Sequence, residues 1–110
     1  MKLPRPADLV LAPRAALLAL DVGKARIGVA ISDIDRRQAF AVTVLHRAKF
    51  QADAKALLKI AEERGADAIV IGLPLGADGR FGSQAQSVES FGRHLAKLTS
   101  LPLSLIHISQ

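Results

Sequence analysis

The first regular pattern in the chain is a pair of apolar runs joined by a short polar turn. The first run covers residues 16–21 and ends on the carboxylate of Asp21, and the second covers 27–31, so strands are predicted over 16–21 and 26–32. The turn between them contains Gly23. Two apolar runs separated by a few residues that include glycine predict a β-hairpin. Their nearly continuous hydrophobicity is typical of central strands that are covered on both faces.

A third strand and a helix are predicted next. Residues 39–45 predict a strand with Val42 and Val44 on one face. Residues 51–64 predict an amphipathic helix, and Gly65 has the position and type of a residue that ends one. The helical prediction depends on apolar residues that recur at i, i+3, i+4 and i+7, namely Ala54, Leu57, Leu58 and Ala61.

The rest of the chain alternates strand, helix and strand. A short buried strand is predicted over 68–72, followed by a glycine-rich loop over 72–82. Ser83 and Gln86 form an S-x-x-Q capping box that would open a second helix. Its apolar stripe would be Val88, Phe91, Leu95 and Leu98. With a fifth strand over 103–108, the order β-β-β-α-β-α-β predicts an α/β fold, a mixed five-stranded sheet with helices on its faces.

Composition narrows the class of protein. The 110 residues suffice for one small domain, and the absence of cysteine excludes disulfides and thiolate metal sites. Fifteen Lys and Arg against ten Asp and Glu give a net charge of +5, which is compatible with a nucleic-acid partner. Four Phe without Trp or Tyr argue against a base-stacking platform, so phosphates are the expected contacts.

The N-terminal part of the chain predicts no targeting signal. Residues 1–14 read as an irregular leader in which prolines and charges interrupt any apolar segment. No apolar run in the sequence approaches the ~20 residues that a membrane span needs. We therefore expect a cytoplasmic protein with no membrane partner. The sequence predicts no particular oligomeric state.

Asp21 is the strongest candidate for chemistry. Ligand sites of α/β sheets lie beyond the carboxyl ends of parallel strands, where Asp21 and the loop after Gly72 should meet. A charge at the end of a buried strand is costly to desolvate unless a cation or several donors meet it. The plain alternative is that Asp21 accepts hydrogen bonds from the amides of its turn.

Two segments resemble one known family. Residues 18–33, Leu-Ala-Leu-Asp-Val-Gly-Lys-Ala-Arg-Ile-Gly-Val-Ala-Ile-Ser-Asp, are similar to the opening motif of the bacterial Holliday-junction-resolvase-like pre-16S rRNA nucleases. Residues 69–79, Ile-Val-Ile-Gly-Leu-Pro-Leu-Gly-Ala-Asp-Gly, followed by Gln84, Val88 and Phe91, resemble its second motif. The resemblance implies a ribonuclease-H-like nuclease domain over residues 15–102.

The resemblance also implies a site and a reaction. Asp21 would be a catalytic carboxylate and a ligand of Mg²⁺ or Mn²⁺, in a nuclease that hydrolyses phosphodiester bonds. The implied partner is nucleic acid: structured RNA such as pre-rRNA in ribosome biogenesis, or DNA junctions. The substrate-binding residues it implies are Gly23, Lys24, Arg26, Gly72, Pro74, Gly79 and Arg80.

The resemblance fails near the end of the chain. Family members continue with Asp-Glu-Arg and a later helix with a third carboxylate, whereas His107, Ile108 and Ser109 stand here. Because Leu-Ser-Leu-Ile-His-Ile-Ser resembles a translated transposase sequencing adaptor, we expect residues 103–110 to be a non-native tail, with the C-terminal helix missing. The fragment would then be inactive as a nuclease.

Two other functions stay open. Without the later carboxylates, the chain would be a nucleic-acid-binding module of the same fold that performs no catalysis. It would then be a natural short paralogue. The third possibility is a fragment of a sugar-kinase or actin-like ATPase, because that superfamily also uses an Asp-x-Gly hairpin.

Overall fold

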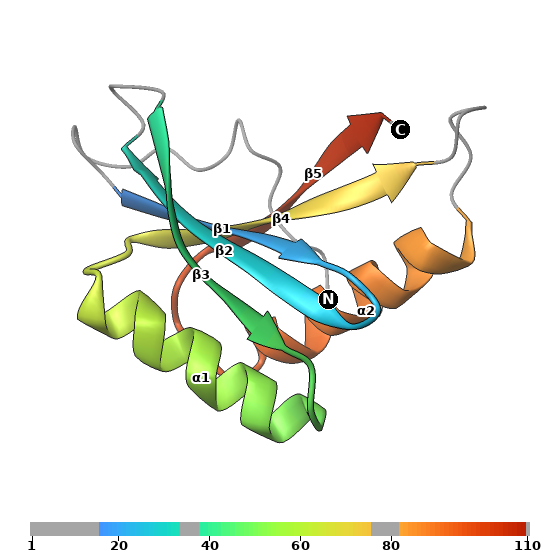
Figure 1. Cartoon of the computed structure of the whole chain (residues 1–110), viewed down its shortest axis with the longest axis horizontal. Coiled ribbons are helices and arrows are strands. Elements are labelled where there is room, and N and C mark those ends of the chain that lie inside the picture. The colour runs from blue at the N-terminus through green and yellow to red at the C-terminus, as the bar shows by residue number, and fades with distance from the viewer. Residues whose placement is uncertain (1–15, 34–37, 76–81, 110) are drawn as a thin grey trace.

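A computed structural model describes residues 16–33, 38–75 and 82–109 of the chain. It contains seven elements in the predicted order, and its strands form one sheet with the order β3-β2-β1-β4-β5 (Figure 1). No helix within these ranges is long and apolar enough to cross a membrane. The elements are β1 (Ala16–Val22), β2 (Arg26–Asp33), β3 (Gln38–His46), α1 (Phe50–Glu63), β4 (Ala68–Leu75), α2 (Ser83–Ala96) and β5 (Leu103–Ser109).

Strand β1 is the centre of this mixed sheet. It pairs antiparallel with β2, where Asp21 lies opposite Gly28, and parallel with β4, where Leu20 lies opposite Ile71. Strands β4 and β5 also pair in parallel. The carboxyl ends of β1, β4 and β5 therefore meet at one edge of the sheet, as the sequence predicts. The residues before Ala16 lie outside the described part of the chain.

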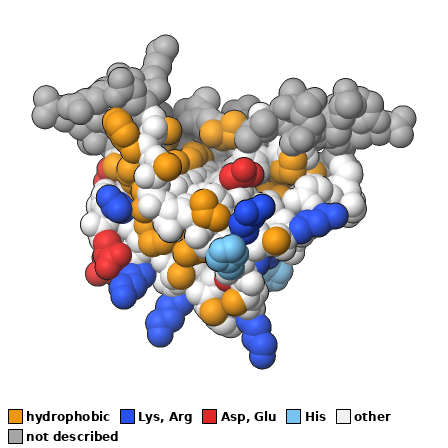
Figure 2. All heavy atoms as spheres, in the orientation of Figure 1, with side chains coloured by type: hydrophobic (Ala, Val, Ile, Leu, Met, Phe, Trp, Pro, Cys, Tyr) orange, Lys and Arg blue, Asp and Glu red, His pale blue; other side chains and the backbone are white. Residues whose placement is uncertain are grey.

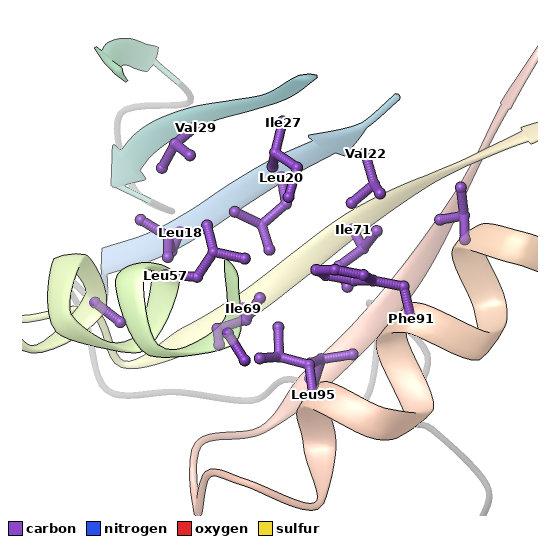
Figure 3. Packing of buried hydrophobic residues seen from close by; sticks show 14 of the residues in the cluster. Leu18, Leu20, Val22, Ile27, Val29, Leu57, Ile69, Ile71, Phe91 and Leu95 are labelled. Atoms are coloured by element: carbon purple, nitrogen blue, oxygen red, sulfur yellow. The ribbon is translucent and has the colours of Figure 1, made fainter. Parts of the chain in front are cut away.

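Both helices cover the same face of the sheet (Figure 1). Alternate residues of β1 point toward the helices, where Leu57 of α1 and Phe91 of α2 meet them (Figure 3). These side chains belong to one buried cluster, and its strand members are Leu18, Leu20, Val22, Ile27, Val29, Ile69, Ile71, Leu73 and Leu103. Because successive side chains of a strand point to opposite faces, the residues between these cluster members lie on the face away from the helices. The sequence pattern does not reveal that both helices share one face.

Helix α1 ends as the sequence predicts. Gly65 follows the C-cap residue Arg64 and has a φ of 65°, which a residue with a Cβ adopts only at a cost. The Gly65 amide donates to the Glu62 carbonyl at 3.2 Å, and the Ala66 amide donates to the Ala61 carbonyl at 2.9 Å. This pair of bonds is the Schellman motif, which satisfies carbonyls that the helix end leaves without partners.

Three predictions about the second half of the chain are wrong in detail. Strand β4 continues to Leu75, so the loop begins later than Gly72, because β5 pairs with the strand as far as that point. Helix α2 has Gly82 as its N-cap, and no side chain caps it, so Ser83 is the first helical residue and forms no capping box. Leu98 lies beyond the end of α2 and is 47% exposed, so it does not belong to the core.

The predicted pairing of Val42 with Val44 on one face is also wrong. Thr43 pairs with Val29 and Ala41 with Ala30, so the register between β2 and β3 shifts and leaves Val42 as an extra residue. Such a bulge interrupts the alternation of side chains along a strand. Val42 packs against the core, whereas Val44 is 56% exposed on the other side.

Candidate functional site

Asp21 lies next to last in β1, the central strand of the sheet, and its side chain is exposed. The expectation of a costly desolvated carboxylate is therefore wrong, because the face of the sheet to which Asp21 belongs is not covered by α1 or α2. The Gly23 amide donates to the Arg26 carbonyl at 2.8 Å and so closes the turn through the backbone. That amide is engaged elsewhere, so the turn does not need the Asp21 carboxylate as its acceptor.

A broad hollow of about 570 Å³ lies over the face of the sheet away from the helices. Asp21 is the one charged residue among the described residues that line it. The wall is otherwise made of small or apolar side chains from all five strands, including Ala19, Gly28, Ala30, Ala41, Val44, Val70, Gly72, Pro74 and Ile106. Gly72 and Pro74, two of the residues implied by the resemblance, thus share one hollow with Asp21.

A second hollow of about 400 Å³ lies beside the turn that follows Asp21. Its lining includes Asp21, Gly23, Lys24 and Arg26, and both basic side chains belong to exposed residues. A carboxylate and two cations around one hollow form a site that attracts a phosphate backbone while it keeps an oxygen ligand nearby. In the space-filling view, basic side chains lie at the left, along the bottom and on the right of the described surface, and also near its middle beside an acidic side chain, with hydrophobic side chains between them (Figure 2). The other two implied substrate contacts, Gly79 and Arg80, lie outside the described residues.

The residues Asp33 and Asp67 lie at the opposite end of β1 from Asp21. Asp33 pairs with Ala16, at the opposite end of β1. Asp67 also binds that end, because its Oδ2 accepts a hydrogen bond from the Ala16 amide at 2.7 Å. Across 16–33, 38–75 and 82–109, no group of three or more His, Asp or Glu could hold a metal ion. The described residues therefore supply one carboxylate at the site and do not fit a two-metal centre, which needs several converging carboxylates.

Arg47 contacts the turn after Asp21 and pairs with Asp53, an arrangement that the sequence did not reveal. Asp53 is 4% exposed, and its Oδ2 lies 3.7 Å from Nε of Arg47. Asp53 Oδ1 accepts a hydrogen bond from the Ala48 amide at 3.0 Å. The sequence indicates only that a carboxylate in the first turn of α1 suits the helix dipole. An arginine just after a strand looks like any surface charge, so no sequence signal distinguishes it.

The fold places the chain first in a broad class. The RuvC protein of T. thermophilus, solved in complex with a Holliday junction substrate, superposes with a TM-score of 0.58 at 9% identity, over 84% of this chain and 64% of that one. A Bacteroides thetaiotaomicron protein described as having an actin-like ATPase fold and unknown function superposes with a TM-score of 0.54 at 12% identity, over 86% of this chain and 33% of that one. Together with the sheet order, the likeness to RuvC identifies the ribonuclease-H-like α/β fold.

The sequence gives the family. Residues 15–107 match the RuvX family, described as Holliday junction resolvase. A Rhodopseudomonas palustris (strain BisB5) protein named "Putative pre-16S rRNA nuclease" is 50% identical over 92 residues, which are 84% of this chain and 58% of that protein. A Nitrobacter hamburgensis protein of the same name is 52% identical over 92 residues, which are 84% of this chain and 56% of that protein. The chain belongs to the RuvX family, and it spans somewhat more than half the length of these curated relatives.

Proposed function

We propose that this chain is the part of a nuclease that contains the catalytic carboxylate Asp21. The nuclease would hydrolyse phosphodiester bonds at the end of pre-16S rRNA during ribosome biogenesis. The observation that carries the proposal is the position of Asp21. Its exposed carboxylate stands at the end of the central strand, between an apolar hollow and a turn with two cations. Membership in the RuvX family and the names of its relatives support this chemistry.

The two hollows would have different roles. The cations Lys24 and Arg26 would bind phosphates of structured RNA, or of DNA junctions, and so set the register of the strand on the protein. Gly72 and Pro74, from β4, would form the wall on the other side of Asp21. Asp21 would then be the residue nearest to the scissile phosphodiester. Gly79 and Arg80, which follow this wall in the sequence, are proposed as further substrate contacts.

A metal requirement belongs to the proposal for the whole enzyme. Mg²⁺ and Mn²⁺ prefer oxygen ligands in octahedral geometry, and Asp21 would be one of them. The described residues do not complete that ligand set. We therefore propose that the 110-residue chain alone cleaves RNA little or not at all. We place the enzyme in the cytoplasm, where rRNA is processed.

The test is a chimera that restores the length of the curated relatives. Residues 1–102 of this chain would be followed by the remaining C-terminal part of the Nitrobacter hamburgensis relative. We expect the chimera to cleave a pre-16S rRNA end only with Mg²⁺ or Mn²⁺, and Asp21→Asn to abolish cleavage while RNA binding persists. Metal-dependent cleavage by the 110-residue chain itself, lost on Asp21→Asn, would overturn the expectation that it is inactive. A chimera that binds RNA but does not cleave it would overturn the nuclease proposal.

Because the described residues bring one carboxylate to the site, a second candidate is a nucleic-acid-binding module without catalysis. This candidate predicts RNA binding that weakens steeply with salt, because bound phosphates release counterions. It also predicts that binding is indifferent to Mg²⁺ and to Asp21→Asn. Reading the gene beyond the Pro102 codon, from genomic DNA without transposase adaptors, separates the two. A frame that continues into further carboxylates supports the enzyme and a non-native tail over 103–110, whereas a genomic Leu103–Gln110 followed by a stop supports the binding module.

A further inference from the structure

Arg47 contacts the turn after Asp21 through both its backbone and its side chain. The Arg47 backbone amide donates to the Ala25 carbonyl at 2.8 Å, which extends the β2–β3 ladder by one bond. The Arg47 side chain then returns to the same turn, where Nη1 donates to the Gly23 carbonyl at 2.8 Å. A third contact, from Gln84 Nε2 to the Val22 carbonyl, is longer at 3.5 Å. Among the described residues, the two short hydrogen bonds that reach the turn from outside the β1–β2 hairpin therefore both come from Arg47.

Arg47 is itself fixed in place. Its Nε lies 3.7 Å from Oδ2 of Asp53, a carboxylate of α1 that is 4% exposed. Its Cζ lies 5.3 Å from the centre of the Phe91 ring, which belongs to α2. A guanidinium over an aromatic ring gains a cation–π interaction in addition to its charge pairing. One side chain thus connects the turn to both helices.

We infer that Arg47 is a positioning residue, which holds the turn and through it Asp21 and the cations Lys24 and Arg26. This role rests on the proposed function, because it gives the fixed turn a purpose in binding nucleic acid. Binding sites require side chains to be held close to their productive geometry by a surrounding shell. The planar guanidinium of Arg47 donates from Nη1 to the Gly23 carbonyl while its Nε stands 3.7 Å from Asp53 Oδ2, an ion-pair distance without a hydrogen bond. The single ammonium of lysine has no second nitrogen for the other partner.

This role differs measurably from a direct contact between Arg47 and phosphate. A residue that acts as a point charge on phosphate keeps most of its effect when lysine replaces arginine. A residue that acts through the turn loses its effect with lysine, because the charge stays and the fork is gone. The comparison of Arg47→Lys with Arg47→Ala therefore distinguishes the two roles.

The experiment measures two quantities on the 110-residue chain. Amide hydrogen exchange of Gly23, whose N–H closes the turn, is compared with that of Ile71 in the buried centre of β4. Affinity is measured with a fluorescein-labelled RNA hairpin that has a single-stranded 3′ tail. The variants are Arg47→Lys, Arg47→Ala and the matched control Arg93→Ala, which removes an exposed arginine that pairs with Glu89 on α2.

We expect both Arg47 variants to raise the exchange rate of Gly23 relative to Ile71 by about tenfold, because local opening becomes easier than global unfolding. We expect both to weaken RNA affinity about fivefold, although lysine keeps the charge. Arg93→Ala should change neither the exchange ratio nor, beyond the loss of one surface charge, the affinity. Full protection of Gly23 in Arg47→Lys, or wild-type affinity in that variant, would overturn the inference.

A second variant keeps the test decisive if Arg47→Ala does not fold. Arg47→Met combined with Asp53→Leu replaces the pair by apolar side chains, a change that buried ion pairs often tolerate. We expect it to fold and still to show rapid exchange at Gly23, whereas protection of Gly23 would overturn the inference. Failure of the wild-type chain to bind the RNA would instead overturn the proposed function, and the exchange ratio would still decide whether Arg47 holds the turn.

Discussion

Asp21 lies directly opposite Gly28 in the β1–β2 ladder, and a Cβ built on Gly28 would lie 3.7 Å from Cβ of Asp21. Side chains of directly opposed residues stand on the same face of a sheet. The carboxylate therefore stands beside a position that has no side chain. Both hollows at the site include Gly28 in their walls, so access to Asp21 depends on this absence.

Gly28→Val should block the site without unfolding the protein. Valine fits a pleated sheet, so we expect the melting temperature to change by no more than a few degrees. The branched side chain would occupy the space beside the carboxylate, and we expect the chimera with the Nitrobacter relative to lose most of its cleavage. Gly28→Ala is the matched control, because its Cβ makes only an ordinary contact with Asp21. Equal cleavage by Gly28→Val and wild type would contradict the argument.

Gly23→Ala should destabilise the chain where Gly28→Ala does not. A Cβ on Gly23 would lie 3.0 Å from the Arg26 carbonyl, the same oxygen that accepts the Gly23 amide. Relief of that clash has to displace the turn, at a cost of about 1–2 kcal/mol. Urea unfolding of the two variants measures the difference. Equal stability of the two variants would show that the turn can yield without cost.

Two of the described ion pairs, Arg47–Asp53 and Arg93–Glu89, should contribute differently to stability. We expect Asp53→Asn to lower the free energy of unfolding by about 2 kcal/mol, because it removes a buried partner of Arg47. Glu89→Gln, at a pair whose side chains are 36% and 48% exposed, should cost less than about 0.5 kcal/mol. Chemical denaturation of both variants tests this order, and a larger loss for Glu89→Gln would contradict it.

Gly65 and Gly82 should respond differently to alanine. Neither has an atom within 4 Å of a Cβ built on it, but only Gly65 has a positive φ, of 65°. Gly65→Ala should therefore cost about 1 kcal/mol through backbone strain alone. Gly82, with a φ of −89°, is the control without backbone strain, so its loss on substitution should be smaller and come from the preference of the N-cap for glycine over alanine. Thermal melts of the two variants compare these costs directly.

The open face of the sheet should cause the chain to associate with itself. Phe40 and Val44 of β3 are 60% and 56% exposed, and Val44 borders the apolar hollow. Exposed apolar patches of this kind promote association. We expect sedimentation to show association that rises with concentration and that Phe40→Thr with Val44→Thr reduces. Leu98→Thr removes a 47% exposed apolar residue beyond α2 and should leave association unchanged, whereas a monomer at all concentrations would contradict the prediction.

Most of the fold can be predicted from local patterns of residues in the sequence. The hairpin around Gly23 depends on residues that are close together in the sequence, and so does the end of α1 at Gly65. The sequence therefore predicts both features. The bulge at Val42 and the extension of β4 to Leu75 depend on partner strands, which a single segment does not contain. The predicted capping box at Ser83 is wrong because Gly82, and not Ser83, is the N-cap residue of α2. No side-chain pattern determines this shift by one residue.

The candidate site also has features that the sequence predicts and features that only the three-dimensional structure shows. Asp21 and the cations of its turn are adjacent in the sequence, so one motif brings them together. The exposure of Asp21 could not be predicted, because it depends on both helices lying on the other face of the sheet. The contact from Arg47 to Gly23 spans 24 residues and joins a strand end to a turn. Such a contact is set by tertiary packing and has no local signature.

Strand β1 joins two kinds of pairing, and this has a consequence for the order in which the protein folds. Its pairing with β2 closes through a short turn, whereas its parallel pairing with β4 joins residues about fifty positions apart, such as Leu20 and Ile71. Local hairpins form in microseconds, and closure of a long loop is entropically costly and late. The β1–β2 hairpin that holds Asp21 should thus form early in folding, before β4 pairs with β1 and adds Gly72 and Pro74 to the site. Nascent chains that have not yet paired β4 with β1 would hold the basic turn without a complete site.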